Sequence, residues 1–203
     1  YSLQKLSDYN IKIIENNIEG LIIQLNDKLI HTQITGKFNA YNLVVVYAVC
    51  DILGLDQNKS IELLSKIKPI EGRFQVIAKN GITAIVDFAH TPDAIEKVLV
   101  SVKDYVKSDG IIITVVGCGG GRDKEKRNKM GYVSSELSDL TIFTSDNPRN
   151  EDPNQIIEDM KMGIDNKKIK KVKTIIDRKD AIKYAVSKSK FNDILLILGK
   201  GHE

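Results

Sequence analysis

From residue 74 onwards the sequence alternates between short apolar runs and longer amphipathic stretches, and this alternation limits the fold more than any other feature. Residues 111–116 and 194–198 are almost wholly apolar, which is typical of strands that are buried on both faces. Strands that alternate with helices form a mostly parallel sheet covered by helices. The sequence therefore predicts an α/β domain over residues 71–203.

The expected elements of this domain follow in regular order. Strands are expected at 74–78, 83–88, 111–116, 140–144, 172–176 and 194–198. Helices are expected at 92–106, 124–137, 153–162 and 179–187. The pair Asn80 and Gly81 is a strong turn signal, so the first two strands should form a hairpin.

Residues 1–70 have a different pattern and are expected to belong to another domain. Short β-type runs at 11–14, 20–25 and 29–34 are separated by Asn, Asp and Gly, which predicts hairpin strands at the edge of a sheet whose remainder is absent. Two helices should follow, at 39–53 and at 57–67. We interpret residues 1–70 as the carboxyl-terminal end of a preceding domain.

Composition excludes several classes of protein. The net charge is only +3, and lysines and acids are interleaved, so no basic face indicates nucleic acid as a partner. The basic run 167–173 is expected to be a solvated helix end or loop. The two cysteines, Cys50 and Cys118, form no metal-binding or disulfide pattern. The chain has no initiator Met, signal peptide or membrane-length apolar run, so we expect a cytoplasmic piece of a longer protein with no membrane partner.

Polar motifs follow four of the predicted strands. They occupy residues 87–93, 117–123, 145–149 and 199–203. Ligands of open parallel sheets bind at the carboxyl ends of the strands, so we expect the four motifs to converge on one site.

The glycine-rich motif at 117–123 is expected to open a helix. Its glycines would permit close backbone approach to a phosphate or carboxylate at the helix N-terminus. It matches neither GxGxxG nor GxxxxGK[ST], so dinucleotide binding and a P-loop are poorly supported. The alternative is a plain structural connection.

The residues around Asp87 suggest a second contact region. Thr91 and Asp93 are explained as helix caps, whereas Asp87 and His90, at the end of a strand, suit hydrogen bonds to sugar hydroxyls or a phosphate. A purely structural role is the alternative for both residues.

The remaining motifs suit an amino acid. Arg122 and Arg149 could each clamp a carboxylate, and Glu203 could accept an ammonium group. Surface ion pairs are the alternative interpretation. Asp146, Asn147 and Pro148 are turn-forming residues that would place Arg149 at the turn's exit.

Six motifs together resemble the Mur ligase family, and within it the members that add diaminopimelate. They are residues 36–42, 71–73, 87–93, 117–127, 146–149 and 199–203. The resemblance implies a three-domain enzyme, monomeric at full length. Residues 1–70 would end its central ATP-binding domain, and residues 71–203 would form its Rossmann-like carboxyl-terminal domain, truncated at the end.

The activity that the resemblance implies is peptide-bond formation in peptidoglycan synthesis. ATP activates a carboxylate of UDP-MurNAc-L-Ala-D-Glu as an acyl phosphate, which the amino group of meso-diaminopimelate attacks. Mg²⁺ and positive side chains offset the charge of the transferring group. Because this sequence lacks GxxGK[ST] and central-domain metal ligands, we expect the chain alone to be inactive.

The resemblance also implies roles for single residues. Asn42 would contact adenine, Asp87 the ribose and Arg73 the ATP phosphates, where Arg73 acts in catalysis; His90 belongs to the same ATP-binding motif. The residues that would hold diaminopimelate are Arg122, Asp146, Asn147, Pro148, Arg149, Gly199 and Glu203. Arg149 would select the substrate through a buried charged contact, since lysine-adding relatives usually differ there.

Two alternatives stay open. A folylpolyglutamate synthetase-like ligase shares the Asp-x-x-His-x-Pro pattern, although residues 146–149 and 199–203 argue against it. A non-catalytic domain that binds an amino acid or nucleotide is compatible with the missing P-loop. The sequence does not separate meso-diaminopimelate from an analogue such as lanthionine.

Overall fold

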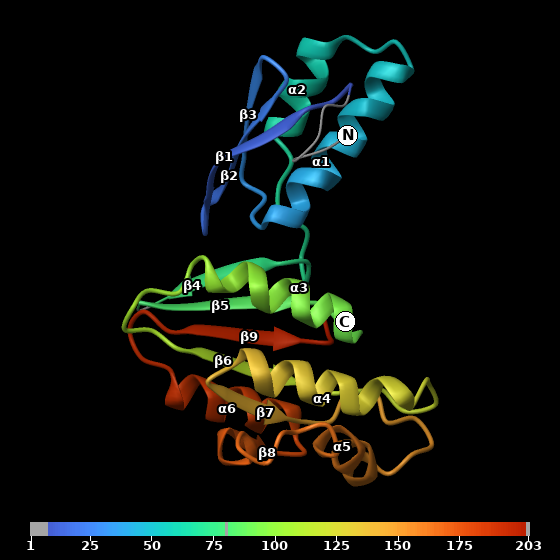
Figure 1. Ribbon diagram of the computed structural model, residues 1–203, viewed down its shortest axis with the longest axis vertical. Coiled ribbons are helices and arrows are strands. Elements are labelled where there is room, and N and C mark those ends of the chain that lie inside the picture. Colours follow the sequence, from blue (N-terminus) through green and yellow to red (C-terminus); the bar gives the residue numbers. More distant parts are fainter. Residues whose placement is uncertain (1–7, 80, 202–203) are drawn as a thin grey trace. The chain divides into compact units, whose positions relative to one another are not determined.

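The structure is a computed structural model that describes residues 8–79 and 81–201 (Figure 1). Two compact units divide the chain, Tyr1–Ile70 and Glu71–Glu203. Among the described residues, no helix has the length and apolar character needed to cross a membrane.

The first unit is a small antiparallel sheet with two helices. Strands β1 (Ile11–Asn17), β2 (Gly20–Leu25) and β3 (Lys28–Thr32) pair in sequence order. Helices α1 (Lys37–Ile52) and α2 (Gln57–Ser65) follow, and Asp56 caps α2 by accepting a hydrogen bond from the Lys59 N–H. The core of the unit joins both layers and contains Ile11, Leu21, Ile23, Leu25, Ile30, Ala40, Leu43, Val44, Tyr47 and Leu64.

Helix α1 is apolar on its outward face as well as on its core face. Val46, Val49 and Ile52 are 48%, 51% and 76% exposed, whereas Val44 and Tyr47 are buried in the core. A helix that exposes several apolar residues away from its core face is typical of one that packs against further protein.

The second unit contains a six-stranded sheet in the order β4-β5-β9-β6-β7-β8. Its strands are β4 (Gln75–Lys79), β5 (Ile82–Asp87), β6 (Ile112–Val116), β7 (Leu140–Phe143), β8 (Val172–Thr174) and β9 (Ile194–Leu198). Only the β4–β5 hairpin is antiparallel, so the predicted α/β fold with a mostly parallel sheet is confirmed. The last strand, β9, lies between β5 and β6 and pairs with both.

Helices cover both faces of this sheet. They are α3 (Pro92–Lys103), α4 (Glu125–Leu137), α5 (Pro153–Lys161) and α6 (Arg178–Lys188). Alternate residues of β6 explain the two layers, because Ile113 and Val115 pack with α6 residues, while the Thr114 hydroxyl lies 2.7 Å from that of Ser138, just after α4. Every residue of β6 is buried.

The basic run 167–173 is a largely exposed connection, in line with its prediction, and ends in the strand expected at 172–176. It contains a 3₁₀ turn, Ile169–Lys171, that leads directly into β8. Strand β8 pairs only with β7 at the edge of the sheet, so its lysines can stay in solvent while the backbone joins the ladder.

Candidate functional site

A polar pocket lies at the carboxyl ends of the parallel strands of the second unit. It is lined by Phe88, His90, Gly119, Arg122, Lys126, Asp146, Asn147, Arg149 and Gly199. These residues follow β5, β6, β7 and β9, so all four strand-end motifs contribute. The parallel sheet brings together six residues that the sequence singled out as binding residues: His90, Arg122, Asp146, Asn147, Arg149 and Gly199.

The other candidate residues lie elsewhere. Arg73 stacks on a wall of the pocket, with its Cζ 4.5 Å from the centre of the Phe88 ring. Pro148 does not line the pocket, because its carbonyl packs against the glycine-rich loop. Asn42 is exposed on α1 of the first unit, where its side chain donates to Asn39 Oδ1 at 2.9 Å. Glu203 lies outside the described residues.

Asp87 is buried and holds two backbone segments. Its Oδ2 accepts from the Phe74 N–H at 2.8 Å and its Oδ1 from the Ala89 N–H at 2.7 Å. Burial raises the pKa of this carboxyl, while the two backbone hydrogen bonds oppose the rise. Because Phe74 has a φ of +45°, an unfavourable value for a bulky residue, Asp87 stabilises a strained segment next to Arg73. Both carboxylate oxygens thus serve the fold, a role that the motif did not reveal.

We expect Asp87→Ala to destabilise the second unit. Each buried N–H that loses its acceptor costs about 1–3 kcal/mol, and the segment that carries Arg73 loses its anchor. Urea denaturation should show the loss of stability. If stability is unchanged, Asp87 does not anchor this segment.

The glycine-rich loop is built for contact with protein backbone. A Cβ atom on Gly120 would lie 1.9 Å from the Pro148 carbonyl oxygen, and one on Gly117 would lie 2.4 Å from that of Thr144. The Gly120 N–H donates to Asn147 O at 2.8 Å and the Gly121 N–H to Glu151 Oε1 at 2.6 Å. These two N–H groups are therefore used inside the protein, and α4 begins only at Glu125, which favours the alternative of a structural connection for this part of the loop.

We expect Gly120→Ala to displace the turn that carries Arg149. A methyl group at 1.9 Å from the Pro148 oxygen cannot be accommodated without moving the backbone, which typically costs about 1–3 kcal/mol. The measurement is the thermal unfolding midpoint. Gly54→Ala is the comparison for backbone strain without crowding, because Gly54 has a φ of +73° and open space around its Cβ position. An unchanged midpoint in Gly120→Ala would show that the close approach contributes nothing.

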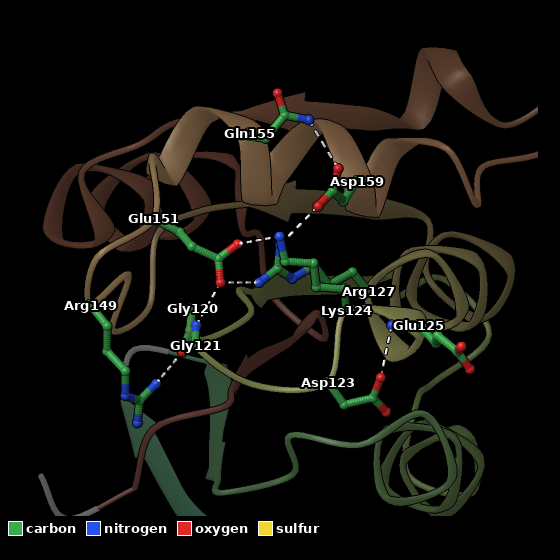
Figure 2. A network of polar contacts seen from close by, with 10 residues as sticks. All are labelled: Gly120, Gly121, Asp123, Lys124, Glu125, Arg127, Arg149, Glu151, Gln155 and Asp159. Carbon is green, nitrogen blue, oxygen red and sulfur yellow. Dashed lines mark hydrogen bonds and ion pairs between the residues drawn. The ribbon is translucent and has the colours of Figure 1, made fainter.

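Three cationic side chains face the pocket. Arg149 has a φ of +52°, is exposed, and donates from Nη1 to Gly120 O at 2.6 Å (Figure 2). Arg122 is exposed, and Lys126 donates to His90 O at 3.0 Å. Arg149 is thus exposed in this chain, and the buried charged contact with the amino acid stays a prediction. This exposure follows from the position of Arg149 at the tip of a turn.

One carboxylate stands among these cations. Asp146 accepts from the Asn147 N–H at 2.7 Å, and Lys200 Nζ lies 3.8 Å from its Oδ1. Three cations beside one carboxylate favour a small molecule with carboxylate groups and an ammonium group. The pocket is therefore suited chemically to an amino acid.

A buried ion network joins α4, α5 and the segment before α5 (Figure 2). The Arg127 side chain has no exposed surface and donates to Asp159 at 2.8 Å and to Glu151 at 2.9 Å. The hydrogen bond from Arg127 is the main reason that the pKa of Glu151 is lowered to about 2. No motif in the sequence points individually to Arg127, Glu151 or Asp159, although one signal is present. Arg127 shares the spacing of the core residue Met130 on α4.

Arg178 is a further positioning residue that no sequence motif indicates. It is the first residue of α6, and it donates to Leu198 O at 2.6 Å and Ser145 O at 3.4 Å. Leu198 is the last residue of β9, and Ser145 lies in the segment that follows β7. Arg178 thus ties together two of the segments that line the pocket.

Comparison with known proteins gives consistent results. The family model for the Mur ligase, glutamate ligase domain matches residues 72–201. UDP-N-acetylmuramoyl-L-alanyl-D-glutamate–2,6-diaminopimelate ligases from Phocaeicola vulgatus and Bacteroides thetaiotaomicron are each 44% identical over 100% of this chain. The one from Clostridioides difficile is 40% identical. The chain spans 42% of the length of each of these relatives.

Solved structures show the same relationship. A UDP-N-acetylmuramoyl-L-alanyl-D-glutamate–2,6-diaminopimelate ligase is 36% identical with a TM-score of 0.66, covering 98% of this chain and 41% of that one. Folylpolyglutamate synthase from Thermotoga maritima has a TM-score of 0.72 at 21% identity, covering 95% of this chain and 44% of that one. At that low identity, the second likeness shows the fold alone.

Proposed function

The chain belongs to the Mur ligase family, and from that premise we propose that it supplies the amino-acid site and part of the ATP site of a diaminopimelate-adding ligase. The observation that carries the proposal is the pocket in which Arg122, Asp146 and Arg149 meet. The names of the relatives that match the whole chain support the same substrate. The acceptor would be UDP-MurNAc-L-Ala-D-Glu and the added amino acid meso-diaminopimelate.

The proposed reaction forms one amide bond. The acceptor carboxylate takes the γ-phosphoryl group of ATP and ADP leaves; the amine of diaminopimelate then attacks the acyl carbon, and phosphate and a proton are released. Arg122 and Arg149 would hold carboxylates of the amino acid, and Asp146 would accept from an ammonium group. Glu203 and Gly199 would complete this site in the full-length protein.

The ATP side of the proposal rests on fewer contacts. Mur ligases are ATP-dependent, and Arg73 on the Phe88 ring would stabilise charge on the transferring phosphoryl group. His90 and Asn42 would contact the nucleotide. We assign the first unit to the end of the central ATP-binding domain, and the outward apolar face of α1 supports this because it suits packing against further protein.

The described residues contain no group of three or more His, Cys, Asp or Glu side chains that could hold a metal ion. We propose that Mg²⁺ is bound mainly by the rest of the central domain in the full-length enzyme. We further propose that this enzyme is a cytoplasmic monomer without nucleic-acid or membrane partners.

The alternatives predict different substrates. A folylpolyglutamate synthetase-like enzyme would add glutamate, which has no second amino group, and would not need a carboxylate such as Asp146 in addition to Glu203. A non-catalytic domain would bind an amino acid or nucleotide without turnover.

The test is ligation by the full-length protein. With ATP, UDP-MurNAc-L-Ala-D-Glu and diaminopimelate it should release phosphate and form the tripeptide product, detected by mass spectrometry. A polypeptide of these 203 residues should form none, because its sequence has no GxxGK[ST] loop. Glutamate addition to a folate by the full-length protein, or no turnover at all, would contradict the proposal.

A further inference from the structure

We propose that Glu151 is a positioning residue that holds the peptide bond between Gly120 and Gly121 in one orientation and thereby fixes Arg149 at the pocket. The assignment of the pocket to an amino acid rests on the proposed function. The contact between Glu151 and this peptide bond, called the latch below, rests on geometry alone.

The two ends of this peptide group have different partners (Figure 2). Its N–H, from Gly121, donates to Glu151 Oε1 at 2.6 Å. Its carbonyl, from Gly120, accepts from Arg149 Nη1 at 2.6 Å. Because one peptide plane carries both groups, the orientation of the N–H decides where the carbonyl points. If the plane rotated, Arg149 would lose its acceptor.

Such a rotation would meet little intrinsic resistance. Both residues that flank the peptide bond are glycines, which have access to backbone conformations closed to other residues, and Gly121 already has a φ of +61°. The orientation must therefore be set by contacts from outside the loop. Glu151 supplies that contact from the segment before α5.

Glu151 is itself held in place by the buried Arg127. The same Oε1 atom that accepts from Gly121 also accepts from Arg127 Nη2 at 2.9 Å. Lys124 lies 3.3 Å from the other oxygen, Oε2, and is largely exposed. One oxygen atom thus joins the buried cation to the loop, whereas the second oxygen faces a solvated partner.

Asp159 provides a matched control within the same network. It pairs with the same guanidinium at 2.8 Å, and its other contact is with Gln155 on α5. Each carboxylate neutralises Arg127, and of the two only Glu151 also bonds to the glycine-rich loop in the described structure. Removing either carboxylate should lower stability, but only the loss of Glu151 should leave the Gly120–Gly121 peptide group free to rotate.

The experiment compares Glu151→Ala, Glu151→Gln and Asp159→Ala in the full-length enzyme. Glu151→Ala should raise the KM for diaminopimelate about tenfold, equivalent to about 1.4 kcal/mol, with little change in the KM for ATP. Glu151→Gln should stay close to wild type, because its amide oxygen can replace Oε1 towards both donors. Asp159→Ala should lose stability without this change in KM.

Hydrogen exchange of the glycine-rich loop tests the latch without any substrate. In Glu151→Ala the amide of Gly121 should exchange faster, and so should that of Gly120, which bonds to Asn147 and not to Glu151. Asp159→Ala should leave both protected. Equal effects of the two alanine variants on KM and exchange would reduce Glu151 to a stability role and overturn the inference.

The two proposals can fail separately. Absence of diaminopimelate-dependent turnover in the wild-type enzyme would refute the proposed function, while the exchange measurement would still decide the latch. Turnover in wild type combined with unchanged loop exchange in Glu151→Ala would refute the latch alone.

Discussion

Replacement of Arg127 by alanine is expected to lower the free energy of unfolding of the second unit by about 3–5 kcal/mol, the range for removing one partner of a buried ion pair. The side chain has no exposed surface, and its guanidinium donates to both Glu151 and Asp159. Without it, two carboxylates that are only about one-fifth exposed would lose the buried cation between them, and α4 would have a cavity on its core side.

Equilibrium urea denaturation measures this loss, and a surface pair provides the control. Lys66 pairs with Glu62 across one turn of α2, where Lys66 is 68% exposed, so Lys66→Ala should cost less than about 1 kcal/mol. A similarly small effect of Arg127→Ala would show that water already solvates the network.

The same substitution should change how stability depends on pH. Arg127 holds the pKa of Glu151 at about 2, below its ordinary value of 4.5. A carboxyl with a lowered pKa stabilises the fold above its ordinary value, and this contribution is lost as pH falls from about 4.5 towards 2. Arg127→Ala should therefore show a shallower loss of stability across this window than wild type. Parallel curves would contradict the pairing.

The sheet was predictable because each of its buried strands appears in the sequence as a short apolar run. The apolar runs that became β6 and β9 lie within one residue of their predicted bounds, since strands buried on both faces are mostly apolar and the one polar residue of β6, Thr114, has a hydrogen-bond partner in Ser138. The convergence of four motifs was also predictable, because it follows from parallel direction alone. The position of β9 between β5 and β6 was not predictable, because it depends on pairing between segments more than 75 residues apart.

The contacts that position the site were not predictable either, because they also join residues that are far apart in the sequence. Arg127 meets Glu151 and Asp159 across separations of 24 and 32 residues, and a charged residue on a helix is usually assigned to solvent. Asp87 was identified as a motif residue, but its hydrogen bonds to Phe74 and Ala89 depend on a loop geometry that no pattern specifies. Residue types indicated the chemistry of the pocket, and tertiary contacts determine its geometry.

Arg149→Ala in the full-length enzyme is expected to reduce kcat/KM for diaminopimelate about 10- to 100-fold. This range corresponds to about 1.5–3 kcal/mol for a hydrogen bond to a charged group. A larger loss would require a buried arginine, but Arg149 is exposed at the turn and keeps part of its hydration. The proposed partner is the carboxylate on the far stereocentre of diaminopimelate, which lysine lacks.

The effect on lysine separates selectivity from a general loss of the site. Lysine should be a poor substrate of wild type, because it leaves the arginine unpaired, and Arg149→Ala should change its use little. The ratio of kcat/KM for diaminopimelate to kcat/KM for lysine should therefore fall almost as much as kcat/KM for diaminopimelate itself. Arg122→Ala is the comparison, since Arg122 lines the same pocket and would contact a group that both amino acids share. If the ratio is unchanged in Arg149→Ala, Arg149 serves only to close the turn on Gly120, and substrate choice lies elsewhere.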